Sequence, residues 1–313
     1  MLASILTVAE KVFVMFLMMG VGYLCYKKRI ITSRGAAQLT NLLLYIVGPC
    51  LIISALQGNS GSVSTGNILL TIGLFLVGMI AAALAMQLLF RSQSPKRAGM
   101  LRYGVVYTNC GFMGLPLAQA ILGNAGVVYA SACLVAFNLL TWTHGYLLLG
   151  GGGDDRRQML KNALLNPGTI SFAVGLPLFA FSLQLPEAIM ATMGSMGAMN
   201  TPLAMIVVGT YLAQLKIKEI FSDSEVLKVT VLRLVVVPAV FLVPLWLLQP
   251  DSGVLITTVL LMAAPVGMNS VLFAIKLGND VPLACKMVAM STLFSILTMP
   301  VVAAVAQRLV AAG

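Results

Sequence analysis

The stretch YTNCGFMGLP occupies residues 107–116 and the stretch AAPVGMNS occupies residues 263–270, each inside a long apolar run. Proline removes a backbone donor and clashes with the preceding helical turn, and glycine lowers helix preference further. The residues concerned are Gly111, Gly114, Pro116, Pro265 and Gly267. We therefore expect two helices that break near their middle, and this pair of breaks is the feature around which the fold is organised.

Composition places the chain in a membrane. Hydrophobic residues are 59% of the 313 residues and charged residues are 9%, with a mean hydropathy of +0.99. Such a chain would precipitate in water but suits lipid, so we expect a polytopic all-α protein in contact with the lipid bilayer. The net charge of +10 indicates orientation and attraction to anionic headgroups. Without an extramembrane domain, we expect no nucleic-acid partner.

Ten apolar runs have about the 20 residues that a spanning helix needs. They lie near residues 4–26, 37–56, 67–90, 99–122, 125–149, 168–185, 188–215, 229–248, 253–277 and 287–310. Trp142 and Tyr146 lie near the end of one run, where the membrane–water interface favours amphipathic rings.

Positive charge alternates from loop to loop. Every Lys and Arg except Lys11 and Arg308 falls in a cluster at residues 27–34, 91–102, 156–161, 216–233 or 276–286. Cytoplasmic loops collect Lys and Arg. The alternation therefore predicts that both termini lie on the outer, periplasmic side of the cell (inner) membrane. Arg233 belongs to the fourth cluster in this interpretation.

The chain divides into two halves of five spans. Residues 1–149 form the first half, residues 150–161 a short cytoplasmic linker that includes GGGGDDRRQ, and residues 162–313 the second half. With an odd number of spans per half, the second half enters the membrane from the opposite side, so we expect an inverted 5+5 repeat. Prolines occupy matching spans: Pro49 and Pro202 the second and seventh, Pro116 and Pro265 the fourth and ninth.

Broken helices at matching places in inverted halves mark a substrate site. Unpaired backbone groups in lipid are tolerated only where they line a cavity or bind something. Each break would expose a helix N-terminus with partial positive charge and free N–H groups, which suits a carboxylate. The alternative is a pair of kinks satisfied by neighbouring helices. The expected substrate-binding residues are Asn109, Cys110, Gly111, Gly114, Pro116, Pro265, Gly267, Asn269 and Ser270.

Two further asparagines, Asn41 and Asn200, lie near the prolines of the second and seventh spans. They either hydrogen-bond between helices or face the substrate path, and we include both in the candidate site. His144 is the only histidine, and we interpret it as an interfacial or packing residue in preference to a proton carrier.

The acidic residues all lie in loops or at span ends. Proton relays and many sodium sites use carboxylates inside the membrane, so the pattern argues against tight coupling to either ion. Sodium held by backbone carbonyls and Asn side chains stays an alternative. The five cysteines lack metal or redox spacing, and we expect no metal and no cofactor. With one His and no buried acid, the chain lacks a nucleophile and base pair, so we expect no enzyme.

At these residues the sequence resembles the auxin efflux carrier family of transporters in its short bacterial form, over essentially the whole chain. Most weight falls on NCGFMGLP, Asn109 to Pro116, which is similar to the family's fourth-helix motif, and on PVG, Pro265 to Gly267, which is similar to its ninth-helix break. NPGT at residues 166–169 and YIVGPC at residues 45–50 resemble its sixth and second helices.

The resemblance implies ten helices in an inverted arrangement similar to bile-acid-type transporters. Helices 1, 2, 6 and 7 would form a scaffold, expected as a homodimer interface, while helices 3–5 and 8–10 would form a moving transport domain in which helices 4 and 9 cross. It also implies that Asn109 contacts the substrate carboxylate and that Pro116 and Pro265 form the crossover of these two helices. Plant members have a large central loop and carry Pro where Ser270 stands, and bacterial relatives are mostly assigned dicarboxylates such as malonate or malate.

These observations together predict a secondary transporter that moves a small organic anion, a carboxylate or dicarboxylate, by elevator-type alternating access without tight ion coupling. A sodium- or proton-coupled carrier of the same fold and an anion channel remain alternatives at this point. A receptor that binds without moving is a further one, since broken helices can bind a ligand while staying in place.

Overall fold

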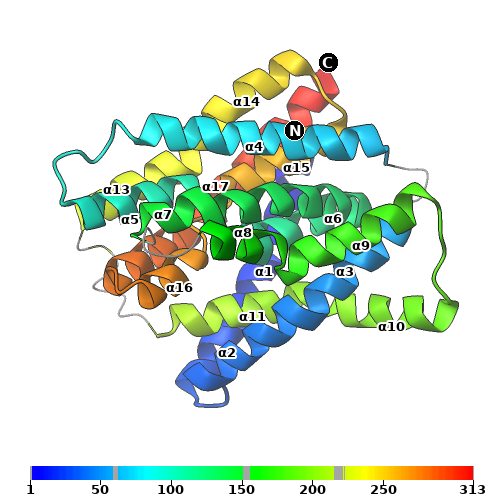
Figure 1. Cartoon of the computed structure of the whole chain (residues 1–313), viewed down its shortest axis with the longest axis horizontal. Coiled ribbons are helices and arrows are strands. Elements are labelled where there is room, and N and C mark those ends of the chain that lie inside the picture. Colours follow the sequence, from blue (N-terminus) through cyan, green and yellow to red (C-terminus); the bar gives the residue numbers. More distant parts are fainter. Residues whose placement is uncertain (1, 59–62, 151–155, 215–220, 222, 313) are drawn as a thin grey trace.

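The computed structural model describes residues 2–58, 63–150, 156–214, 221 and 223–312, and its regular secondary structure is helical throughout these residues (Figure 1). Within the described residues, 7 helices are long and apolar enough to cross a membrane. They are Ala9–Lys27, Ser33–Gly58, Thr65–Met86, Cys110–Leu148, Glu187–Leu212, Ser224–Leu248 and Val281–Val310. The chain is thus a polytopic helical membrane protein, while the count of ten helices and the repeat stay predictions.

The first half contains α1 (Leu2–Lys27), α2 (Ser33–Leu42), η1 (Leu43–Val47), α3 (Gly48–Gly58), α4 (Thr65–Met86), α5 (Pro95–Val106), η2 (Cys110–Gly114), α6 (Leu115–Leu140), η3 (Thr141–Gly145) and α7 (Tyr146–Leu148). The second contains α8 (Arg156–Leu164), α9 (Pro167–Ala180), α10 (Glu187–Ala198), α11 (Asn200–Leu212), α13 (Ser224–Val231), η4 (Leu232–Val236), α14 (Val237–Leu248), α15 (Ser252–Ala263), α16 (Asn269–Lys276) and α17 (Val281–Ala312).

The expected fourth, sixth and ninth spans are shorter than a full crossing. The sixth is α9, and the ninth is divided between α15 and α16. The fourth is divided between α5 and the start of α6. Helix α6 also contains most of the expected fifth span, and only a kink at Gly123 separates the two spans. Gly123 adopts φ 62° there, and Gly126 lies against the backbone of Ala118. The chain therefore folds back at Gly123, at a φ that glycine adopts without steric cost.

Three π-helical segments each end two residues before a proline. The pairs are Val47 and Pro49, Gly114 and Pro116, and Val236 and Pro238. A proline ring cannot donate a hydrogen bond and crowds the carbonyl four residues earlier. Widening the preceding turn relieves this conflict without ending the helix, and such π-bulges occur frequently at functional sites.

The expected linker spans residues 150–161. Residues 151–155 lie outside the described residues, and α8 begins at Arg156. The end of the linker is therefore helical and continues to Leu164.

Figure 1 shows α4 along one side of the bundle, α2, α3, α10 and α11 along the opposite side, and α6 between them. Helix α1 packs against α11, and α3 packs against α9 and α10. Helix α15 packs against α6 and α17. The span Cys110–Leu148 and the span Val281–Val310 are each 56% buried, against 22–33% for the other five, so these two spans form the centre of the bundle. The remaining spans turn apolar faces outward, as expected in lipid.

An ion pair joins the N-terminal ends of α5 and α13. Arg97 contacts Asp223, which also accepts a hydrogen bond from the backbone N–H of Glu225 and so caps α13. Burial by itself raises the pKa of Asp223, but the hydrogen bonds from Arg97 and Glu225 and the nearby positive charges outweigh it and lower that pKa. The pair thus stabilises the fold above the ordinary titration range of Asp, and this contribution is lost as pH falls through the lowered pKa.

Replacement of Gly209 by Ala is expected to separate α1 from α11. A Cβ atom on Gly209 would overlap the backbone carbonyl of Met19, and such small residues are what lets membrane helices approach closely. Overpacking of this kind costs about 1–3 kcal/mol, so the purified variant should unfold at a lower temperature than the parent. Gly20→Ala is the control, because no atom lies within 4 Å of its added Cβ. Equal unfolding temperatures for the two variants would contradict this packing.

Candidate functional site

Both expected breaks are present, and the two interrupted helices meet there. Helix α5 ends at Val106 and η2 begins at Cys110, while α15 ends at Ala263 and α16 begins at Asn269. Thr108 and Val266 form an isolated antiparallel bridge between the two gaps. We call the paired residues 107–109 and 264–268 the crossing.

Backbone groups freed by the breaks bond to each other across the crossing. The N–H of Asn109 donates to the carbonyl of Pro265 at 2.7 Å, and the N–H of Gly267 donates to the carbonyl of Tyr107 at 2.9 Å. These two N–H groups are therefore not free for a ligand, contrary to the expectation that the breaks leave their N–H groups unpaired. The pairing satisfies polar groups that lipid cannot.

Two hydroxyl side chains complete the crossing. Thr108 Oγ1 donates to the carbonyls of Leu261 at 2.7 Å and Ala264 at 3.1 Å. The N–H of Val266 donates to Ser291 Oγ of α17 at 3.0 Å. Thr108 and Ser291 were not predicted, because a hydroxyl inside an apolar run most often bonds to its own helix.

Arg233 was placed in a cytoplasmic cluster by its sequence, and this assignment is wrong. It lies in η4 with no exposed surface. Its Nε donates to the carbonyl of Ala264 at 3.0 Å, and its Nη1 donates to those of Val105 at 2.9 Å and Val106 at 3.1 Å. Its Nη2 donates to the carbonyl of Met262. One guanidinium thus binds the C-terminal ends of both interrupted helices, where carbonyls have no partner in the helix.

Close approach at the crossing requires glycine at position 267. A Cβ atom there would lie 2.8 Å from the carbonyl oxygen of Thr108 and 3.3 Å from that of Tyr107. Both neighbours are backbone atoms, which cannot rotate away. In addition to weakening the helix, glycine at position 267 therefore allows two segments of the chain to come into close contact.

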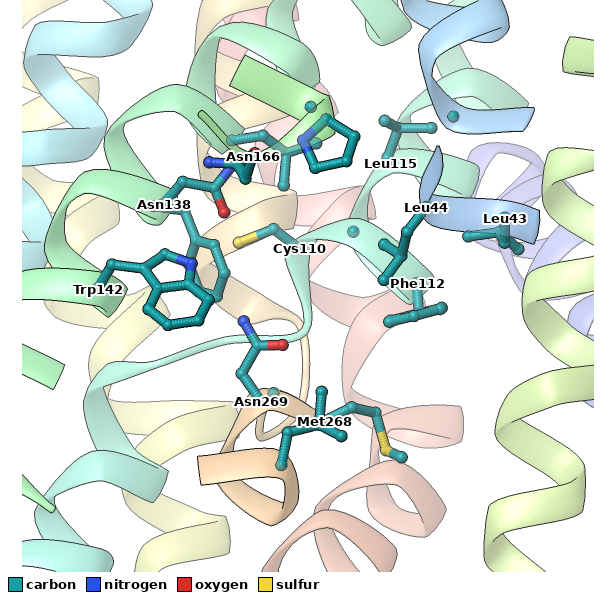
Figure 2. A pocket seen from close by; sticks show the side chains of 18 of the residues that line it. Leu43, Leu44, Cys110, Phe112, Leu115, Asn138, Trp142, Asn166, Met268 and Asn269 are labelled. Carbon is teal, nitrogen blue, oxygen red and sulfur yellow. The ribbon is translucent and has the colours of Figure 1, made fainter. Parts of the chain in front are cut away.

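A cavity of about 600 Å³ lies beside the crossing. Figure 2 shows Cys110, Asn138, Trp142 and Asn269 around one part of it, with Leu43, Leu44 and Phe112 toward another. Of the residues predicted for the substrate site, those that line the cavity are Asn109, Cys110, Gly111, Asn200, Gly267 and Asn269.

The other predicted residues have structural positions outside the lining. Gly114 packs closely on Leu261, Pro116 is buried in the first turn of α6, and Pro265 accepts the bond from Asn109. Ser270 is buried and donates to the carbonyl of Gly267 at 2.8 Å. Asn41 is exposed on α2.

Buried amide donors without a partner face this region. Asn109 and Asn200 are each 3% exposed, and the Nδ2 atom of each has no hydrogen-bond partner among the described residues. No described side chain caps the helix starts at Cys110 and Asn269, and both residues line the cavity. Unpaired buried donors are costly, so this arrangement is suited to an acceptor-rich ligand.

Sequence reasoning missed the aromatic and basic part of the lining. Trp142, assigned to the membrane–water interface, lines the cavity, and Tyr146, assigned with it, is buried. Lys276 lies over both rings, with Nζ 5.6 Å from the Trp142 centroid and 5.0 Å from the Tyr146 centroid. Lys276 and Lys161 are exposed lining residues, so the cavity reaches the surface at positive charges. Further lining residues are Phe112, Asn138, Phe137, Phe273 and Asn166.

An amide pair links the two halves at the wall of this cavity. Asn138 Nδ2 of α6 donates to Asn166 Oδ1 at 2.9 Å, and Asn166 also caps α9 by accepting from the N–H of Thr169. His144 lies nearby in η3, where its Nδ1 is 2.8 Å from the Tyr107 hydroxyl. The histidine therefore supports a residue of the crossing and packs within the bundle.

A family model described as "Membrane transport protein" matches residues 7–303. An uncharacterized transporter of Methanothermobacter thermautotrophicus is 25% identical over 295 residues, which are 93% of this chain and 96% of that protein. An uncharacterized transporter of Methanocaldococcus jannaschii is 26% identical over 243 residues, or 74% of this chain and 76% of its own length.

Gly267→Ala is expected to force the two segments of the crossing apart. The added Cβ would press on the backbone of Thr108, at a cost of about 1–3 kcal/mol. We predict a lower unfolding temperature for the purified variant. Gly111→Ala is the matched control in the cavity lining, because its added Cβ meets only Leu134 Cδ2 at 3.9 Å. A Gly267 variant as stable as the Gly111 variant would contradict the close approach.

Proposed function

The chain belongs to the membrane transport protein family, also called the auxin efflux carrier family, and we propose that it carries an organic anion across the cell (inner) membrane. One observation carries the proposal. Two uncapped helix starts and two unpartnered buried amides converge on a single cavity beside the crossing. Helix N-termini favour negative charge, and free N–H groups are donors for an anion's oxygens.

The lining supports a carboxylate with a small organic body. No Asp or Glu is among the described residues that line the cavity, whereas Lys161 and Lys276 line it. Amide donors at Asn109 and Asn200 would hold one carboxylate, while aromatic residues such as Trp142 pack against the carbon skeleton. In a dicarboxylate, the second group would pair with the ammonium of Lys276, which draws anions toward the cavity.

Alternating access is proposed to occur by movement of one helix group against another. The cavity has lining residues from both groups: Pro49 and Asn200 from the expected scaffold helices, and Asn109 and Asn269 from the expected transport domain. Close packing of α1 on α11 supports a rigid scaffold, through which two copies would associate as a homodimer. Movement of the crossing past this scaffold would open the same site first to one side of the membrane and then to the other. Both termini are proposed to lie on the outer side.

Transport is proposed to proceed without a coupled ion. The mechanism needs only that the substrate charge be neutralised inside the membrane, and fixed amide and helix dipoles supply that. Net movement of an anion then carries charge.

Asn109→Ala is predicted to weaken binding of carboxylates such as malonate or malate by about tenfold or more, because a hydrogen bond to a charged group contributes about 1.5–3 kcal/mol. Isothermal titration or a thermal-shift series on purified protein would measure this. The matched control is Asn41→Ala, since Asn41 is exposed and outside the cavity, and it should bind like the parent. Unchanged affinity in the Asn109 variant would remove that residue from the site.

Proteoliposomes given substrate, with neither a sodium nor a proton gradient, are predicted to show a substrate-dependent current. The current should saturate with substrate concentration, as expected for a carrier. Strict dependence on sodium or protons would replace the uncoupled mechanism by symport or antiport. Unitary currents in a bilayer recording would instead indicate a channel.

A further inference from the structure

The interrupted helices sort their charged ends onto two sides of the crossing. The starts at Cys110 and Asn269 line the cavity, whereas the carbonyls at the ends of α5 and α15 bind Arg233. Helix starts carry partial positive charge and helix ends carry partial negative charge. The guanidinium therefore lies on the negative ends and leaves the positive ends to the substrate.

The charge of Arg233 is balanced by dipoles. Its side chain is fully buried, and no described carboxylate forms an ion pair with it. Four backbone carbonyls accept its hydrogen bonds, from Val105 and Val106 on one interrupted helix and from Met262 and Ala264 on the other. A buried charge is retained in a membrane protein only with such partners, and it marks function by default.

The same set of acceptors is what a coupled transporter offers to its ion. Unwound carbonyls and the C-terminal ends of broken helices coordinate sodium or protons in carriers with interrupted helices. Here the carbonyls are already bonded to a side chain that cannot deprotonate and that is tethered to η4. A sodium ion would have to displace the guanidinium and would be repelled by its charge.

We propose that the guanidinium of Arg233 is a resident cation that takes the place of a coupling ion at the crossing. The inference rests on the proposed transport function and deepens it, because it names the residue that makes the carrier independent of sodium. Arg233 is a positioning residue: it is absent from the cavity lining and acts on the substrate through the crossing that it holds together.

Removing the guanidinium should create a requirement for an added cation. In Arg233→Ala, the four hydrogen bonds to backbone carbonyls are lost, and the space beside the crossing is open to a small ion. We expect the purified variant to unfold at a lower temperature, and millimolar guanidinium or sodium to raise that temperature again. Tetramethylammonium, which has no N–H donor and is too bulky to approach carbonyls closely, should have no effect.

The parent protein and Arg102→Ala are the controls for this rescue. Arg102 also donates to a backbone carbonyl, that of Leu89 at 2.8 and 3.0 Å, but this hydrogen bond is exposed and neither residue belongs to the crossing. Neither control should respond to guanidinium or sodium more than to tetramethylammonium. A folded Arg233→Ala protein that shows no cation-specific shift would overturn the inference.

Length-matched variants separate charge from packing, and they also decide the question where the Ala variant does not fold. Arg233→Lys keeps the charge with fewer donors, whereas Arg233→Met keeps a similar length without charge. We expect the Lys variant to retain part of the substrate transport and the Met variant to lose it. Transport by the Met variant equal to or above that of the Lys variant would show that the residue only fills space.

The two proposals fail in different ways. If the parent protein neither binds nor transports any carboxylate, the proposed function fails, while cation rescue of the unfolding temperature still supports Arg233 as the resident cation. If the parent transports carboxylates only in the presence of sodium, the resident-cation inference fails and the transporter assignment stands.

Discussion

Backbone pairing at the crossing is the constraint on which the rest of this structure depends. A helix that breaks inside lipid leaves N–H and C=O groups that water cannot satisfy, at a cost of several kcal/mol each. Here two breaks are placed against each other, so that Asn109 bonds to Pro265 and Gly267 bonds to Tyr107. Each break therefore supplies hydrogen-bond partners for the other. The two segments come into close contact at Gly267, where a larger residue would force the backbone of Thr108 to shift.

The electrostatic character of the site follows from this pairing. Once the central groups are bonded to each other, four helix ends remain, two positive and two negative. The negative ends are neutralised by Arg233 from a π-helical segment, and the positive ends start at residues that line the cavity. The unpartnered amides of Asn109 and Asn200 add donors on the same side. No Asp or Glu is among the described residues that line the cavity, and this arrangement of donors supports the proposed binding of an anion.

The sequence predicted the membrane class and the positions of both breaks, because proline and glycine act locally on the helix. It did not predict which groups form hydrogen bonds with the residues at the breaks, since residues such as Thr108 and its partners lie more than 150 positions apart in the chain. Arg233 was misassigned because it follows Lys228 in a basic cluster, although the residues around it, VTVLRLVVVP, are almost all apolar. Nothing in the sequence distinguishes Asn41 from Asn200, because each lies near a proline in its span. The fold shows that Asn41 is exposed and Asn200 is buried.

A density map of the purified protein with a bound dicarboxylate such as malonate would show whether the crossing exists and whether an anion binds beside it. We expect two interrupted helices paired through residues 107–109 and 264–268, with ligand density in contact with the amides of Asn109 or Asn200 and the helix starts at Cys110 and Asn269. Two continuous helices, or a ligand bound away from these groups, would contradict this expectation.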